Sequence, residues 1–107
     1  MARFLVLWRR NPVGPWPTDP VENLELMERN FAGIDDLIKK GGIKDFGFFM
    51  SGSSGYAISE GESAEAFRNL ALLVPYFEFE VQEIIPYEKG KETIRAITRT
   101  FARSAKK

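Results

Sequence analysis

The chain has 107 residues, of which 44% are hydrophobic and 28% charged, so its composition is that of a single globular domain. Fifteen basic residues balance fifteen acidic ones, and the sequence contains no cysteine and no histidine. These two missing residue types exclude disulfides, thiol nucleophiles, cysteine–histidine zinc sites and imidazole acid–base chemistry, so we expect neither a metal nor a cofactor.

Residues 3–9 form the first predicted strand, and its side chains are apolar on both faces. The two apolar sets alternate along the strand, with Phe4, Val6 and Trp8 on one face and Leu5 and Leu7 on the other. A strand that is apolar on both faces is buried on both, so we expect it at the centre of a sheet. The run is too short for a signal peptide or a membrane span, so the expected location is cytoplasmic, with no membrane partner.

A proline-rich connection, residues 11–18, follows this strand and carries Trp16. Because prolines fix the backbone angle φ, we expect a rigid loop here. Trp16 then has two interpretations: it covers a cavity as a lid, or it packs the loop onto the body of the domain. The second is the more common role of such a tryptophan.

Asp19, Pro20 and Glu22 mark the start of the first predicted helix, since these residue types favour the cap and the first turn. The apolar residues that follow recur every three or four positions and form one stripe: Leu24, Met27, Phe31, Ile34 and Ile38. Gly41 and Gly42 end the helix. The stripe predicts a helix that covers a sheet.

Two short strands, residues 43–50 and 56–59, flank the glycine- and serine-rich segment 51–55, which predicts a β-hairpin. A glycine-rich turn can also cradle a phosphate, but no Lys-Ser or Lys-Thr pair follows it and no helix starts directly after it. Ser63 is the expected cap of a second helix, which Pro75 ends. The inner face of this helix is predicted to contain Phe67, Leu70, Ala71 and Val74.

The last predicted strand, residues 76–85, alternates between apolar and polar side chains. One face carries Phe77, Phe79 and Val81, and the other carries Tyr76, Glu78, Glu80 and Gln82. The element order β-α-β-β-α-β predicts an α+β fold over residues 1–87, a ferredoxin-like sandwich in which two helices cover one face of a four-stranded sheet. In this topology the first and last strands lie side by side and antiparallel.

Residues 88–107 are predicted to form an additional basic amphipathic helix. They contain seven basic and two acidic residues, whereas residues 1–87 contain eight basic and thirteen acidic ones. The basic residues alternate with the apolar residues Ile94, Ile97, Phe101 and Ala105 and do not form a block. We therefore favour a helix that packs on the acidic body of this chain or of a partner over one that binds nucleic acid or an anionic membrane.

Residues 72–81, LLVPYFEFEV, resemble the passage from the second helix to the last strand in muconolactone isomerase-like proteins of the dimeric α/β-barrel superfamily. Residues 55–60, GYAISE, together with Ile85-Pro86, resemble small ferredoxin-like proteins of the same superfamily. The resemblance implies a homodimer in which two sheets close face to face around a shared cavity. Members that rely on histidine or haem differ from this chain, whereas muconolactone isomerase moves a proton without metal or cofactor.

The distribution of apolar side chains also predicts a homodimer, independently of the resemblance. With one set of the first strand under the helices, Leu5 and Leu7 lie on the uncovered face of the sheet, together with Phe49 and one of Tyr56 or Ala57 from the hairpin. Burying these side chains contributes on the order of 5–10 kcal/mol. The whole stability of such a domain is about 5–15 kcal/mol, so we expect an isologous dimer that covers this face.

The candidate ligand site lies on the same uncovered face and comprises Arg3, Arg9, Tyr76, Glu78 and Glu80. Inside a cavity between two sheets, a desolvated carboxylate can transfer protons and an arginine can hold a small anionic molecule. The alternative is structural: the two glutamates lie on an edge strand, where they pair with the arginines or keep the edge soluble.

Three classes of function follow from these patterns. We favour a small-molecule-binding or structural homodimer with no assignable chemistry. The second class is a cofactor-independent isomerase or lyase that acts on a small organic acid by Glu/Tyr acid–base catalysis, so whether the protein is an enzyme stays open. The third is an interaction module that acts through the C-terminal helix; nucleic acid is disfavoured as its partner because the sheet lacks aromatic pairs on a basic surface.

Overall fold

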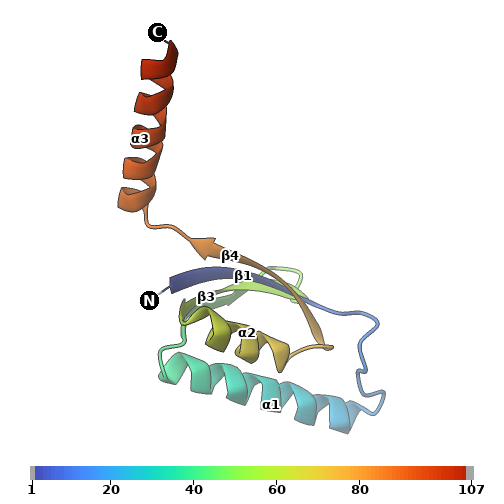
Figure 1. Ribbon diagram of the computed structural model, residues 1–107. Helices are drawn as coiled ribbons and strands as arrows, with labels where there is room; N and C mark the ends of the chain where they lie inside the picture. Colours follow the sequence, from blue (N-terminus) through green and yellow to red (C-terminus); the bar gives the residue numbers. More distant parts are fainter. Residues whose placement is uncertain (1, 106–107) are drawn as a thin grey trace.

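The computed structural model describes residues 2–105 as a four-stranded antiparallel sheet with two helices on one face and a third helix that projects away from it (Figure 1). The elements are β1 (Ala2–Arg10), α1 (Pro20–Lys39), β2 (Ile43–Phe48), β3 (Ser54–Gly61), α2 (Ser63–Ala71), β4 (Phe77–Ile84) and α3 (Tyr87–Ala105). Met1, Lys106 and Lys107 lie outside the described residues, so the predicted segments 1–87 and 88–107 extend beyond them.

The strand order is β2-β3-β1-β4, with every neighbouring pair antiparallel. The two-sided apolar strand β1 is therefore central, and β4 lies beside it, as the alternation of the sequence predicts. The α+β class is confirmed, and the element order is compatible with the ferredoxin-like sandwich. The edges of the sheet are β2 and β4.

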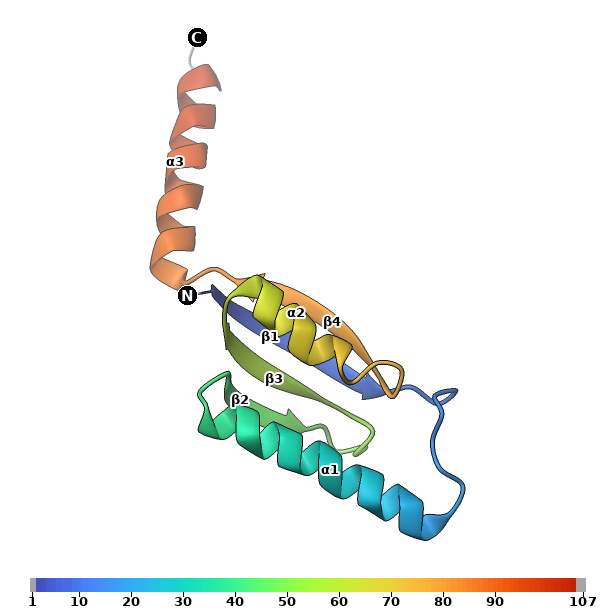
Figure 2. The same cartoon turned by 60° about the horizontal axis from the view of Figure 1, so that its bottom comes forward.

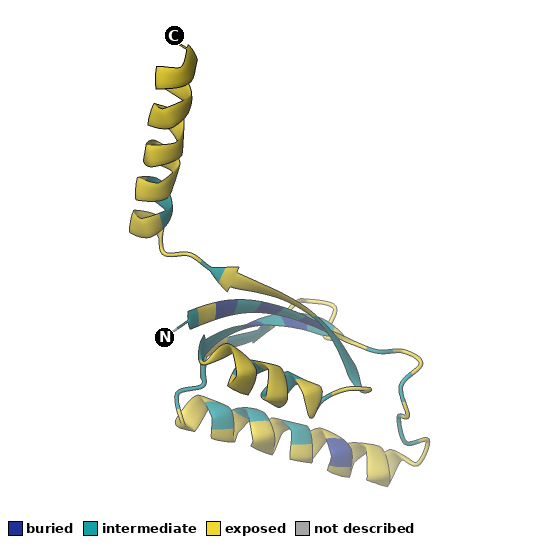
Figure 3. Cartoon of the chain, viewed as in Figure 1, coloured by how far each residue is buried: buried dark blue, intermediate teal, exposed yellow. Residues whose placement is uncertain are grey.

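The strand register places the apolar side chains on the predicted faces. Val6 pairs with Ala57 of β3 and Val81 of β4, on the face that the helices cover. Within residues 2–105 the buried hydrophobic side chains are Phe4, Val6, Trp8, Leu26 and Ala57, most of them from this layer. Leu5 and Leu7 lie on the opposite face, where they are half-buried (Figure 3).

Two glycines of the β2–β3 hairpin lie directly under aromatic rings. Gly55 pairs with Trp8, and a Cβ atom at Gly55 would clash with the Trp8 ring. Gly47 pairs with Tyr56, and a Cβ atom there would clash with the Tyr56 ring. Trp8 also stacks on Phe46 with 5.6 Å between ring centroids. The rings therefore occupy the space that glycine leaves free.

Helix α1 begins as the sequence predicts but turns a different side toward the sheet. The Asp19 side chain accepts a hydrogen bond from the backbone N–H of Val21 at 3.2 Å, which satisfies one of the free donors at the helix start. The predicted stripe is not the buried face, however: Leu24 and Ile38 are 52% and 46% exposed, whereas Leu26, outside the stripe, is buried. Three residues of the stripe, Met27, Phe31 and Ile34, instead line the space between α1 and α2.

Helix α2 differs from the prediction in its cap and in its inner face. The N-cap residue is Glu62, and Ser63 is already helical. Phe67, Ala71 and Val74 were expected to face the sheet but are exposed. The helix ends at Ala71, so Val74 lies beyond the range in which helical periodicity applies, and the apolar side is made by Ala66, Leu70 and the following Leu73.

Helix α3 does not pack on the rest of the described chain (Figures 1 and 3). Its residues are exposed except for the half-buried Gly90 and Lys91. As a result, the radius of gyration is 19.1 Å, compared with about 13 Å for a compact domain of 100 residues. Among residues 2–105, no helix combines the length and the apolar character needed to cross a membrane.

Candidate functional site

The larger of two hollows lies on the helix-covered face of the sheet, between α1 and α2. Its volume is about 450 Å³, which is within the range of small-molecule sites. We call it the inter-helix groove; its lining is mainly aromatic and aliphatic and includes Val6, Trp8, Met27, Phe31, Leu70 and Phe77. Polar groups at its walls come from Arg10, Asn23, Asn30, Ser59 and Asn69. The apolar stripes of the two helices predict close packing between helices and sheet, so the sequence does not predict this groove.

The smaller hollow, the sheet-face pocket, lies on the opposite face of the sheet and contains three of the predicted site residues. Its volume is about 240 Å³, and it is lined by Leu7, Arg9, Phe49, Ser54, Glu78 and Glu80, with Trp8 and Phe79 below. The register explains the grouping, because Arg9 pairs with Glu78 and Leu7 pairs with Glu80 across the β1–β4 ladder. Side chains of paired residues share a face of the sheet.

The Arg9 and Glu78 side chains are bonded to each other in this pocket. The Arg9 Nε–H donates to Glu78 Oε2 at 2.7 Å. Both side chains remain open to solvent, with exposed fractions of 71% and 42%. An exposed pair of this kind contributes little to stability. Glu80 is also exposed and makes no ion pair with any of residues 2–105, so its carboxylate is the acceptor that the pocket offers.

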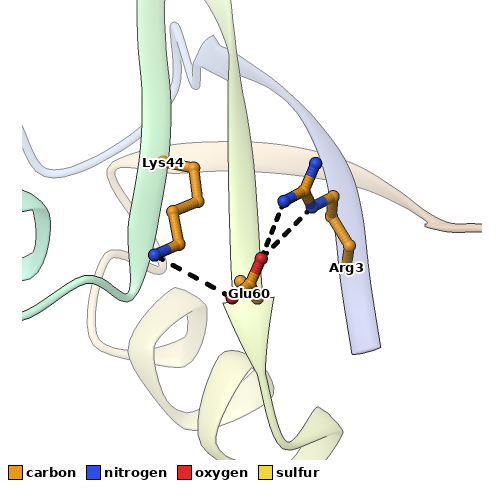
Figure 4. Close-up of polar contacts among 3 residues, drawn as sticks. All are labelled: Arg3, Lys44 and Glu60. Atoms are coloured by element: carbon orange, nitrogen blue, oxygen red, sulfur yellow. Dashed lines mark hydrogen bonds and ion pairs between the residues drawn. The ribbon is translucent and has the colours of Figure 1, made fainter. Parts of the chain in front are cut away.

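Arg3 lies at the other end of β1 and belongs to a separate ion cluster (Figure 4). Its guanidinium donates two hydrogen bonds to Glu60 Oε2, at 2.9 and 3.2 Å, while Lys44 Nζ lies 3.9 Å from Glu60 Oε1. The hydrogen bonds from Arg3 lower the pKa of Glu60, and the positive charge of Lys44 acts in the same direction, against the opposing effect of partial burial. Arg3 therefore positions a carboxylate and does not reach the sheet-face pocket.

Replacing Arg3 with alanine should raise the pKa of Glu60, because it removes the hydrogen bonds that favour the ionised carboxylate. A carboxylate with a lowered pKa in the folded state adds stability above its ordinary pKa, and that stability is lost as the pH falls toward the lowered value. The R3A variant should show a weaker acid dependence, because Lys44 still lowers the pKa of Glu60. Carbon NMR titration of the Glu60 carboxyl measures the shift directly.

The matched control is Arg9→Ala, since the Arg9 guanidinium bonds Glu78 and leaves Glu60 untouched. The Glu60 titration curve should be the same in R9A and in the wild-type protein. An unchanged Glu60 titration in R3A would contradict the assigned cause of the shift.

Tyr76, which directly precedes β4, contacts Trp16. Neither residue lines the sheet-face pocket. Their ring centroids are 5.2 Å apart. The indole N–H of Trp16 donates to the Asn11 carbonyl at 2.6 Å, and the Arg10 guanidinium lies 4.3 Å from the Trp16 ring centroid. The cavity that Trp16 borders is the inter-helix groove. These contacts fix the loop to the body of the domain.

Tyr56 and Phe49 extend the apolar part of the uncovered face. Their rings stack with centroids 6.3 Å apart. The Tyr56 hydroxyl donates to Asp45 Oδ2 at 2.8 Å, and this hydrogen bond is the main reason that the pKa of Tyr56 is raised. Phe49 was expected on this face as an apolar neighbour of Leu7, not as a site residue. Ser54 was not predicted, because the strand register that pairs it with Arg9 is not visible in the sequence.

The groups at these sites offer hydrogen bonding, ion pairing and apolar contact. Within residues 2–105, no three acidic side chains are arranged to hold a metal ion. No known protein-family model matches the chain, and no curated protein is significantly similar to it. Function is therefore inferred from the fold, the two hollows and the unpacked surfaces.

Proposed function

We propose that this protein is a homodimer of the dimeric α/β-barrel type, in which the uncovered faces of two ferredoxin-like sheets pack together and enclose a small-molecule site. One observation supports it above the others: an apolar strip runs across the uncovered face of the sheet, and no described helix lies on it. The strip consists of Leu5, Leu7, Phe49, Tyr56 and Ile58.

The surroundings of this strip are typical of a protein interface. The ion pairs Arg3–Glu60 and Arg9–Glu78 lie at its two ends and supply a polar rim around the apolar centre. A single copy also has a small hydrophobic core, since only five hydrophobic side chains are buried among residues 2–105. Pairing of two strips adds the apolar burial that the isolated chain lacks.

In such a dimer the sheet-face pocket becomes an enclosed site between the sheets. Its charged lining consists of Arg9, Glu78 and Glu80, so its net charge is negative. Arg9 is bonded to Glu78, which leaves the Glu80 carboxylate free. This balance favours a neutral or cationic molecule that donates hydrogen bonds to Glu80, in place of the anionic molecule that the arginines alone suggest.

The oligomeric state of the full-length protein tests this proposal. Sedimentation velocity at micromolar concentration should give twice the chain mass of 12.2 kDa. Native mass spectrometry of the same sample should show the dimer and any small molecule that remains in it. A species with the mass of one chain throughout the micromolar range would overturn the proposal.

A further inference from the structure

The inter-helix groove is an apolar surface that nothing in the described chain fills. Figure 2 shows α1 beside β2 and α2 above β1 and β4, with β3 visible between the two helices. Met27, Phe31 and Phe48 line the groove and are each more than a third exposed. An apolar groove of this size rarely stays in contact with water and usually marks a site where another element binds.

Helix α3 has the properties of an element that binds such a groove. Ile94, Ile97 and Phe101 form one apolar stripe and are 66%, 50% and 70% exposed. A helix of 19 residues without packing partners is only marginally stable in water, so α3 needs a surface to fold against. This surface is absent from the rest of its own described chain.

The polar residues beside the α3 stripe do not prevent burial. The hydroxyl groups of Thr93, Thr100 and Ser104 each donate to the carbonyl four residues earlier, at 2.9, 3.0 and 3.1 Å. Because these groups are already hydrogen-bonded within the helix, burying them leaves no unpaired donor.

We propose that α3 of one copy binds in the inter-helix groove of a second copy. The charges of the two helices are complementary: α1 has five acidic and two basic residues, whereas α3 has five basic and two acidic ones. Glu28 and Asp35 lie three or four residues from Leu24, Phe31 and Ile38, and thus border the apolar stripe of α1. On α3 the basic residue that borders the apolar stripe is Lys91, three residues before Ile94, and it is placed to pair with them.

The lengths of the two helices also match. Helix α1 has 20 residues and α3 has 19, which corresponds to about 30 Å and 28 Å at 1.5 Å per residue. The groove follows α1 from Asn23 to Leu37. The whole apolar stripe of α3 therefore fits along it.

The connection between β4 and α3 excludes the groove of the same chain. Only Ile85 and Pro86 join β4 to α3, and so short a link spans about 10 Å. Helix α2 lies between the β4 edge and the groove, so α3 cannot pass it (Figure 2). Figure 1 shows α3 on the side of the sheet opposite α1 and α2, so in a sheet-to-sheet dimer it points toward the partner; this route rests on the proposed function.

Two variants of the full-length chain, one with a substituted groove and one with a substituted α3, test whether α3 binds the groove of the second copy. The groove variant is Met27→Asp with Phe31→Asp, and the helix variant is Ile97→Asp with Phe101→Asp. Each alone should raise the dimer Kd at least about a hundredfold, because an apolar contact is replaced by a buried charge on both sides of the dimer. An equimolar mixture should recover a dimer, since the intact α3 of the groove variant can bind the intact groove of the helix variant. Sedimentation velocity measures both results.

The matched controls place aspartate on the outer sides of the same helices, as Ala32→Asp in α1 and Ala96→Asp in α3. Both controls should dimerise like the wild-type protein. If the groove variant fails to fold by circular dichroism, Glu28→Arg with Asp35→Arg replaces it and is mixed with Lys91→Glu. Restored dimerisation in that mixture supports the same contact.

Three outcomes would overturn the inference. If mixing restores nothing although each variant is weakened, α3 binds within its own chain. If both variants dimerise normally, α3 contributes nothing to the dimer. If the helix variant dimerises normally but loses binding to phosphatidylglycerol vesicles, α3 is a membrane-surface helix. A dimer that survives Leu7→Glu but not the helix variant would refute the sheet-to-sheet interface and still support α3 exchange, which separates the two proposals.

Discussion

Replacing Leu7 with glutamate should convert the dimer to a monomer. Leu7 lies at the centre of the apolar strip, between Tyr56 and Glu80 in the strand register. In a two-fold symmetric interface the substitution acts twice, and each copy loses about 2–3 kcal/mol of apolar burial. The new carboxylate also lies beside Glu80, so burying it adds a like-charge penalty. The dimer Kd should rise by at least about three orders of magnitude.

Sedimentation equilibrium over a range of concentrations measures this change. Val13→Glu is the matched control, because it makes the same kind of substitution at a loop residue that is 89% exposed. V13E should dimerise like the wild-type protein. A dimer of unchanged Kd in L7E would show that the uncovered face of the sheet is not the interface.

Replacing Trp8 with alanine should cost most of the stability of the fold. Trp8 is only 8% exposed and lies within about 6 Å, between ring centroids, of Phe46, Phe48 and Phe77. Truncation of a buried tryptophan to alanine costs about 3–5 kcal/mol, because the cavity it leaves is only partly refilled. Domains of this size have about 5–15 kcal/mol in total, so W8A should unfold at a clearly lower urea concentration than the wild-type protein.

Urea unfolding followed by far-ultraviolet circular dichroism tests this prediction, at one fixed protein concentration because dimerisation itself adds stability. Trp16→Ala is the control: Trp16 is half-buried and packs a loop, so its loss should shift the midpoint less. Equal midpoints for W8A and W16A would contradict the central role of Trp8 in the core.

Much of the sheet could be predicted from the sequence because strand periodicity fixes which side chains share a face. The two-sided apolar pattern of residues 4–8 correctly predicts a central strand, and the alternation of β4 correctly places Phe79 and Val81 on the helix side. Helix packing is less predictable. The stripe of Leu24 to Ile38 shows which side of α1 is apolar, but an apolar side can face a sheet or a partner equally well. Here Met27, Phe31 and Ile34 line the groove, whereas Leu24 and Ile38 are exposed and lie outside its lining.

The sequence predicts the candidate site correctly only for residues that share a face of the sheet and are also neighbours in the strand ladder. Arg9, Glu78 and Glu80 share a face and are adjacent in the β1–β4 ladder, so they lie together. Arg3 shares that face, but six residues of extended strand separate it from Arg9 by about 20 Å. Tyr76 precedes β4, where the alternation of the strand does not apply, and its ring contacts Trp16 instead.

The glycines under the aromatic rings prevent the strands of the hairpin from pairing in the wrong register. Gly55 lies opposite both Trp8 and Phe48, and Gly47 lies opposite Tyr56. A slip of one residue would bring a side chain into the space that each ring fills, and it would also turn the apolar residues of the hairpin to the wrong face. Misaligned strands are therefore blocked by steric exclusion during folding.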